Sequence, residues 1–173
     1  LAASRNERIA SFAKQYLESQ SDESKDELIA RYKSALKKKG DAGHGAVVFK
    51  RNCAGCHKIG DRGHAIGPSL AAAITRGPDS ILVNVLAPSR EVNPQYLNYV
   101  VMSLDGRSYS GMIASENATS IQLKRAESAS DTLLRSDIDW IHNTGKSIMP
   151  EGLEQSISPQ AMADLIAFLQ ESL

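Results

Sequence analysis

The stretch NCAGCHKIG, residues 52–60, contains both cysteines of this 173-residue chain. Two residues separate Cys53 from Cys56, and His57 follows directly. Because positions i, i+3 and i+4 share one face of a helical turn, we expect the two thiols and the imidazole to point the same way. A chain of this length can bury roughly 70% of its unfolded surface and needs no disulfide to fold. The stretch is therefore the first candidate for a binding site.

Composition limits the kinds of partner that the chain can have. Lys plus Arg equal Asp plus Glu, 20 against 20, so no overall positive field favours nucleic acid or anionic lipid. No run approaches the roughly 18 apolar residues of a membrane span, and the amino end lacks the apolar run of a signal peptide. We expect no nucleic-acid partner and no transmembrane segment in this chain. Either a leader has been removed or the chain is a piece of a longer protein.

Helical periodicity dominates both ends of the chain. Apolar residues recur at helical spacing within 9–17 and again within 28–36, which predicts a pair of helices over residues 1–40. Another helix is expected from residue 41 into the cysteine stretch. Proline and serine then mark further helix starts. Pro78 is expected to begin a helix that Pro88 ends, and Ser158 with Pro159 to begin a terminal one.

The pattern changes to strict alternation between Tyr96 and about Leu134. Alternation with period two is typical of strands with one buried face. Asp105-Gly106 and Glu116-Asn117 are turn signals between the alternating runs. We expect a small antiparallel sheet of three or four strands here.

Several chemistries use two cysteines with this spacing. A structural zinc site needs four ligands, but His44, His64 and His142 are scattered and form no second ligand pair. A thioredoxin-like dithiol follows a strand and begins a helix, whereas a helix is expected before this motif. Zinc, a redox dithiol and an inert pair of thiols are disfavoured but stay open.

Covalent haem attachment explains the whole motif. Cys-x-x-Cys-His is the signature of c-type haem attachment. Cys53 and Cys56 would form thioethers to the porphyrin, and His57 would be an axial ligand to the iron. The motif therefore predicts one covalently bound haem c.

A second axial ligand is sought among the four methionines. Met102 and Met112 lie in expected strands and Met162 on the last helix, where packing is the ordinary role. Met149 lies in NTGKSIMPEGLEQSIS, residues 143–158, which has neither helical nor strand periodicity. Pro150 disfavours helix at the residue before it, so the segment is expected to be a loop that can cover a planar cofactor. Met149 is the predicted second ligand, and the histidines are weaker candidates.

Three stretches in this order resemble class I c-type cytochromes: GAVVFKRNCAGCH at 45–57, GPSL at 67–70 and MPEGLEQSISPQAMADLIAFL at 149–169. The resemblance implies a mainly α cytochrome c fold whose distal methionine, here Met149, precedes the last helix. Residues 41–173 would be the haem domain and residues 1–40 an N-terminal helical extension or linker.

The same resemblance assigns further contacts. The first and last helices would cross with Gly45 and Phe49 against Leu165 and Phe168. The carbonyl of Pro68 would orient the imidazole of His57.

The alternating region, about 96–142, departs from the common class I pattern and would be an insert. It resembles the planctomycete and verrucomicrobial type of haem-binding domain, which often lies at the carboxyl end of large predicted dehydrogenases. SLDGRSYSGMI at 103–113 and SIMPEGLE at 147–154 carry this resemblance. The insert would cover a haem edge or dock a partner. Candidates to contact the haem propionates are Tyr96, Tyr99, Tyr109, Trp140, Arg76 and Arg107.

These features favour an electron carrier over an enzyme. With His57 and Met149 both bound, the iron has no vacant position for a substrate. The expected partner is a redox protein, a dehydrogenase or another cytochrome, and the resemblance implies a periplasmic or otherwise extracytoplasmic location. Two alternatives stay open: a catalytic or sensory haem with a labile distal ligand that binds peroxide or a gas, and a zinc-bound interaction module.

Overall fold

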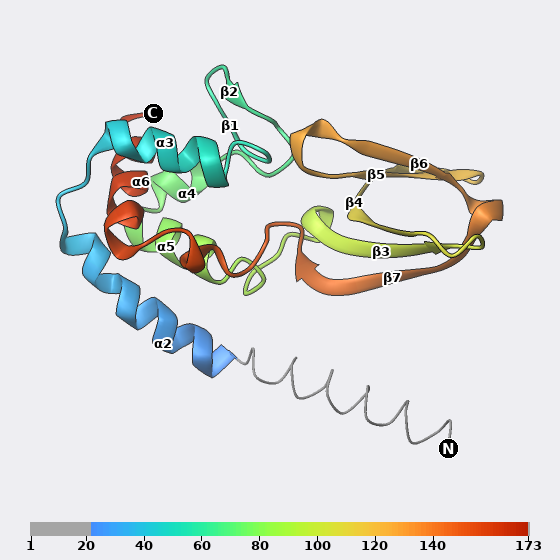
Figure 1. Ribbon diagram of the computed structural model, residues 1–173, viewed down its shortest axis with the longest axis horizontal. Coiled ribbons are helices and arrows are strands. Elements are labelled where there is room, and N and C mark those ends of the chain that lie inside the picture. Colours follow the sequence, from blue (N-terminus) through green and yellow to red (C-terminus); the bar gives the residue numbers. More distant parts are fainter. Residues whose placement is uncertain (1–21, 173) are drawn as a thin grey trace.

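The computed structural model describes residues 22–172. A group of helices forms one part of the molecule, and an antiparallel sheet extends from it to one side (Figure 1). The helix expected within residues 9–17 lies outside the described residues. Within residues 22–172, no helix is both long and apolar enough to cross a membrane.

Among residues 22–172, the helical part contains five α-helices and two short 3-10 helices, one of which, η5 (Leu153–Gln155), directly precedes the last helix. Two predicted starts are confirmed: Pro78 is the first residue of its helix, and the Ser158 side chain accepts a hydrogen bond from the amide of Ala161. The other elements are α2 (Asp22–Tyr32), η1 (Lys33–Lys37), α3 (Ala42–Asn52), α4 (Ala71–Thr75), α5 (Pro78–Leu86) and α6 (Pro159–Glu171).

Helices α3 and α6 cross closely, as the resemblance to class I cytochromes implies. The rings of Phe49 and Phe168 lie 5.5 Å apart at an interplanar angle of 44°. A Cβ atom on Gly45 would overlap with the backbone carbonyl of Asp164 and lie 2.7 Å from the Cβ of Phe168. Glycine at this position therefore allows the two helix backbones to approach each other.

The residues before α3 also contribute to this core. Leu28, Ile29, Tyr32 and Ala35 are buried in the same hydrophobic cluster as the other helices. The Tyr32 hydroxyl donates a hydrogen bond to the carbonyl of Ile157 (2.9 Å). This part of the expected extension over residues 1–40 therefore packs into the same core as the later helices. The boundary between the extension and the haem domain stays a prediction.

The sheet is larger than the sequence predicts. The turns at 105–106 and 116–117 separate strands as expected. However, five strands pair in the order β6-β5-β4-β3-β7 instead of three or four, so the description as mainly α is not confirmed. The strands are β3 (Leu97–Ser103), β4 (Ser108–Glu116), β5 (Ser120–Lys124), β6 (Ser130–Leu134) and β7 (Ile138–Ser147); β1 (Lys58–Ile59) and β2 (Arg62–Gly63) form a separate hairpin.

Strand β7 extends beyond the insert boundary of 142 and into the segment expected to be a loop. The prediction of irregular structure is therefore wrong for residues 143–147. The pairing of β3 with β7 shifts register between Leu97 and Tyr99, and Gly145 has a φ of 68°. Such irregularities break the period of two, which explains why the sequence pattern does not reveal the strand.

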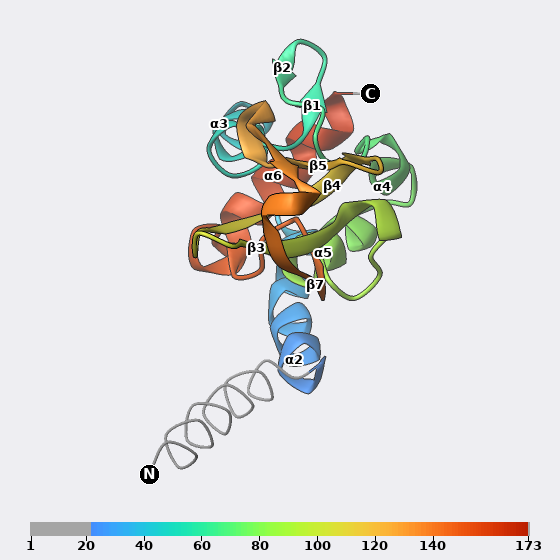
Figure 2. The same ribbon diagram turned by 90° about the vertical axis from the view of Figure 1, so that its right-hand side faces the viewer.

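The sheet has a small core of its own. Val101, Ile121 and Leu123 are fully buried in a cluster separate from that of the helices. Figures 1 and 2 show β5 and β6 folded over β3 and β7. The buried cluster draws its residues from β3 and β5.

Candidate functional site

The end of α3 places the three residues of the Cys-x-x-Cys-His motif on one turn. The Cys53 amide still donates to the carbonyl of Phe49, as in a helix. The amides of Cys56 and His57 then both donate to the carbonyl of Cys53, at 3.0 and 2.8 Å. This turn keeps both cysteine side chains and the imidazole within one short segment.

The imidazole of His57 is buried and held by a hydrogen bond. Its Nδ1 lies 3.0 Å from the carbonyl oxygen of Pro68. Because a carbonyl can only accept, Nδ1 carries the proton and Nε2 keeps its lone pair. Burial lowers the pKa of His57, and the weaker opposing influence is the Pro68 hydrogen bond. The neutral imidazole that results is the form that binds metals.

Gly67 is a site residue that sequence reasoning missed. A Cβ atom at this position would lie 2.7 Å from Cε1 and 3.0 Å from Nδ1 of His57. Only glycine lets the loop backbone pass this close to the ring, so Gly67 and Pro68 together form the support for His57. The Gly-Pro pair in the sequence was the available signal.

One cavity brings all five predicted site residues together. Cys53, Cys56, His57, Pro68 and Met149 line a cavity with a volume of about 310 Å³. This volume lies at the lower end of the range of roughly 300–1,000 Å³ for cofactor sites. Its remaining apolar lining comes from Phe49, Leu70, Ala72, Ala73, Ile74, Ile81, Val85, Pro88, Val92, Ile148, Leu165 and Leu169. The apolar walls and the convergent His, Cys and Met side chains fit a haem group.

Met149 differs from the other three methionines. It is half-buried, lies after β7 and lines the cavity. Met102 and Met112 lie in strands β3 and β4, and Met162 is fully buried in the helical core. Within the described residues, Met149 is the one methionine placed where it can reach a bound group.

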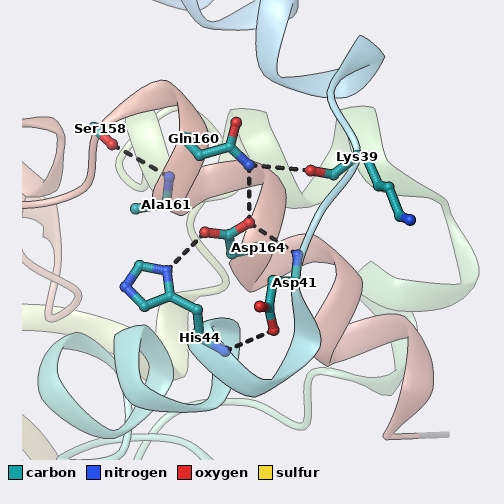
Figure 3. Close-up of polar contacts among 7 residues, drawn as sticks. All are labelled: Lys39, Asp41, His44, Ser158, Gln160, Ala161 and Asp164. Atoms are coloured by element: carbon teal, nitrogen blue, oxygen red, sulfur yellow. Dashed lines mark hydrogen bonds and ion pairs between the residues drawn. The ribbon is translucent and has the colours of Figure 1, made fainter.

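The remaining histidines have other surroundings. His44 Nδ1 lies 2.7 Å from a carboxylate oxygen of Asp164 near the start of α3 (Figure 3). His64 Nδ1 lies 3.2 Å from the Ser128 hydroxyl, and His142 is exposed on β7.

Over residues 22–172, no group of three or more His, Cys, Asp or Glu side chains could hold a metal ion. The zinc alternative therefore has no set of ligands in this part of the chain.

The cysteine thiols also lack the character of a redox dithiol. Burial raises the pKa of Cys53 to about 12, and repulsion from Cys56 adds to the effect. Burial raises the pKa of Cys56 as well. A dithiol catalyst needs a lowered thiol pKa, which gives the reactive thiolate. The environment of this pair favours the protonated form instead.

The polar candidates for propionate contacts separate into two groups. Arg76 and Tyr96 line the cavity. Arg107 instead pairs with Asp105 (2.8 Å) at a turn of the sheet. Tyr99, Tyr109 and Trp140 lie on strands and are not part of the lining. Sequence reasoning did not single out the other polar lining residues, which include Asn84, Glu91, Asn93 and Gln95.

The sheet contacts the cysteine turn through a short 3-10 helix, η3 (Ala126–Ser128), that connects β5 to β6. The amide of Glu127 donates a hydrogen bond to the carbonyl of Gly55 (2.6 Å). Glu127 and Ser128 both have positive φ angles, 59° and 61°, which are uncommon for residues other than glycine. The connection therefore adopts a strained conformation where it covers the turn between the two cysteines.

Comparison with known proteins points in the same direction. A search of curated proteins finds no match to the chain. Residues 42–97 match the model of the family described as Cytochrome c. The matched segment includes Cys53, Cys56, His57 and Pro68 but ends before most of the sheet and before Met149. The match supports a c-type cytochrome domain in this part of the chain, with covalently bound haem, iron and electron transfer as its associated properties.

Proposed function

We propose that the chain binds one haem c covalently, with His57 and Met149 as axial ligands, and serves as a one-electron carrier. The observation that carries the proposal is the single cavity lined by Cys53, Cys56, His57 and Met149. The cytochrome c match over residues 42–97 supports the attachment half of this site. Residues 41–173 would form the haem domain, of the planctomycete and verrucomicrobial type.

Each site residue has a defined task in this proposal. A haem held here supplies a one-electron Fe(II)/Fe(III) couple. Cys53 and Cys56 would hold the porphyrin through thioether bonds, and the Pro68 carbonyl holds the His57 imidazole in one tautomer and orientation. The soft thioether sulfur of Met149 would favour Fe(II) more than a second imidazole does, so ligation by His57 and Met149 would raise the reduction potential relative to two imidazoles.

Two filled axial positions leave no open position for a substrate, so the proposal is a carrier and not an enzyme. The partner would be a dehydrogenase or another cytochrome, because a one-electron carrier needs a donor and an acceptor. Weak redox encounters bury less than about 1,200 Å². The resemblance to class I cytochromes supports a periplasmic or otherwise extracytoplasmic location for such a carrier.

The sheet would act as a cover over one side of the site. Its η3 connection lies against Gly55 between the two cysteines, and the end of β7 leads into the Met149 segment. A cover at these positions would limit the access of water, which is one way in which a protein adjusts a reduction potential.

The proposal is tested with protein produced alongside a haem-attachment system. The mass should increase by one haem per chain, the colour should survive acid-acetone extraction, and Cys53→Ala with Cys56→Ala should abolish both. The wild-type protein should cycle reversibly between oxidised and reduced forms. Steady peroxide turnover well above that of free haem would favour the catalytic alternative and contradict an electron carrier.

A further inference from the structure

Residues 147–149, the three residues that end at Met149, each have an acceptor for the backbone amide. The Ser147 amide donates to the Ser89 hydroxyl (3.2 Å) and the Ile148 amide to the Tyr96 carbonyl (2.8 Å). The Met149 amide donates to the hydroxyl of Ser147 (3.1 Å). Two of these three acceptors are serine side chains, which can be removed without changing the backbone.

These acceptors connect the segment to both parts of the molecule. Ser89 follows α5, two residues after Ala87 of the helical core. Ser147 is the last residue of β7 and pairs with Leu97 at the start of β3. The backbone before Met149 is therefore held by the helical part on one side and by the sheet on the other.

We propose that Ser89 and Ser147 are positioning residues that hold Met149 in place as the distal ligand, so that the sheet contributes to ligand geometry. This inference rests on the proposed function, because it requires Met149 to bind iron. Ser147 is part of the cavity lining and Ser89 is not, but each acts here through the backbone, because its hydroxyl accepts a hydrogen bond from an amide of the Met149 segment.

Loosening this segment has a measurable consequence. Met149 on a restrained segment competes well for the iron against an added ligand such as imidazole. The loss of either serine hydrogen bond weakens this restraint. The net contribution of one hydrogen bond corresponds to a change of roughly 2- to 12-fold in an equilibrium constant. A serine that merely stabilised the fold would change the unfolding equilibrium and leave competition at the iron unchanged.

The experiment titrates the oxidised, haem-loaded full chain with imidazole, which competes with Met149. Ser147→Ala and Ser89→Ala should each raise the apparent imidazole affinity by about 2- to 12-fold. Ser147→Thr keeps the hydroxyl and should stay near the wild-type value. Ser115→Ala is the control, because that exposed hydroxyl lies 3.4 Å from Gln122 on the sheet and far along the chain from Met149.

A second readout on the same haem-loaded chain does not depend on ligand binding at the iron. Amide hydrogen exchange should become faster at Met149 in Ser147→Ala and at Ser147 in Ser89→Ala. Unchanged imidazole affinity in both alanine variants, with loss of the far-red Fe(III)–Met band in Met149→Ala, would overturn the positioning role and leave the ligand in place. An unchanged band in Met149→Ala would overturn the ligand assignment and this inference with it.

Discussion

The helical part and the sheet bury their side chains on very different scales. The helices share one large core that includes Phe49, Leu82 and Leu165. The sheet fully buries only Val101, Ile121 and Leu123 in its separate cluster. Each of these three residues therefore matters more to the sheet than a single residue matters to the helical core. The comparison also shows why the contacts at η3 and at the end of β7 are important, since they connect a small unit to a large one.

The largest effect is expected where α3 crosses α6. Gly45→Ala introduces a Cβ atom that overlaps with the backbone carbonyl of Asp164, which has no flexible group to move aside. We expect a loss of more than about 4 kcal/mol in the free energy of unfolding, measured by urea denaturation. Gly43→Ala is the control on the same helix, because its nearest neighbour is the Asp41 side chain at 3.2 Å. Equal stability of the two variants would show that the helices do not cross as described.

The next prediction separates the two cores. Leu123→Ala and Leu82→Ala each remove a fully buried leucine, and each should cost about 2–5 kcal/mol. Amide hydrogen exchange should show that Leu123→Ala opens the sheet while α3 and α6 stay protected. Leu82→Ala should instead increase exchange throughout the helices. If both variants open all elements together, the sheet and the helices form one cooperative unit.

Asp164 offers a pH-dependent test of the helical part. Its buried carboxylate accepts hydrogen bonds from the Asp41 amide and the Gln160 side chain and contacts the His44 ring (Figure 3). Burial is the largest single influence and would raise the pKa of Asp164, but these hydrogen bonds together outweigh it and hold the pKa below its usual range. Asp164→Asn should cost about 1–3 kcal/mol at neutral pH.

The sign of the pH dependence follows from that lowered pKa. Folded Asp164 binds a proton less readily than unfolded Asp164, whose pKa is about 3.9. Its stabilising contribution is therefore present above about pH 4 and is lost as the pH falls through the lower folded pKa. The difference in unfolding free energy between wild type and Asp164→Asn should shrink between pH 5 and strongly acidic pH. A constant difference over that interval would contradict this role of the carboxylate.

The smallest effect is expected at the start of α6. Ser158→Ala removes the side-chain acceptor for the Ala161 amide and should cost about 1 kcal/mol in the free energy of unfolding. Ser158→Asn keeps a capping oxygen and should remain close to wild type. Thermal unfolding of the two variants gives the comparison.

Sequence reasoning was most successful where the evidence is local. The turn holding Cys53, Cys56 and His57, and the starts of α5 at Pro78 and α6 at Pro159, depend on nearby residues. Their signals are spacing, proline and serine, which can be interpreted without knowing the rest of the fold. Met149 also lines the same cavity, and its role as an iron ligand stays a prediction.

Several features that depend on distant partners were not predicted. The need for glycine at 67 arises from the His57 ring, ten residues away. The full length of strand β7 is defined by its irregular pairing with β3, which the sequence pattern does not indicate. The hydrogen bond between Glu127 and Gly55 joins positions that are far apart in the sequence. A sequence pattern has no access to such contacts before the chain folds.

The central claim is that His57 and Met149 bind the iron of one covalently attached haem. The most direct measurement is the absorption spectrum of the oxidised, haem-loaded protein and of its Met149→Ala variant, with Met102→Ala as the control. We predict a weak far-red band of Fe(III)–Met coordination in the wild type and in Met102→Ala, and its loss in Met149→Ala. A wild-type spectrum without this band, or a band that survives in Met149→Ala, would contradict the account.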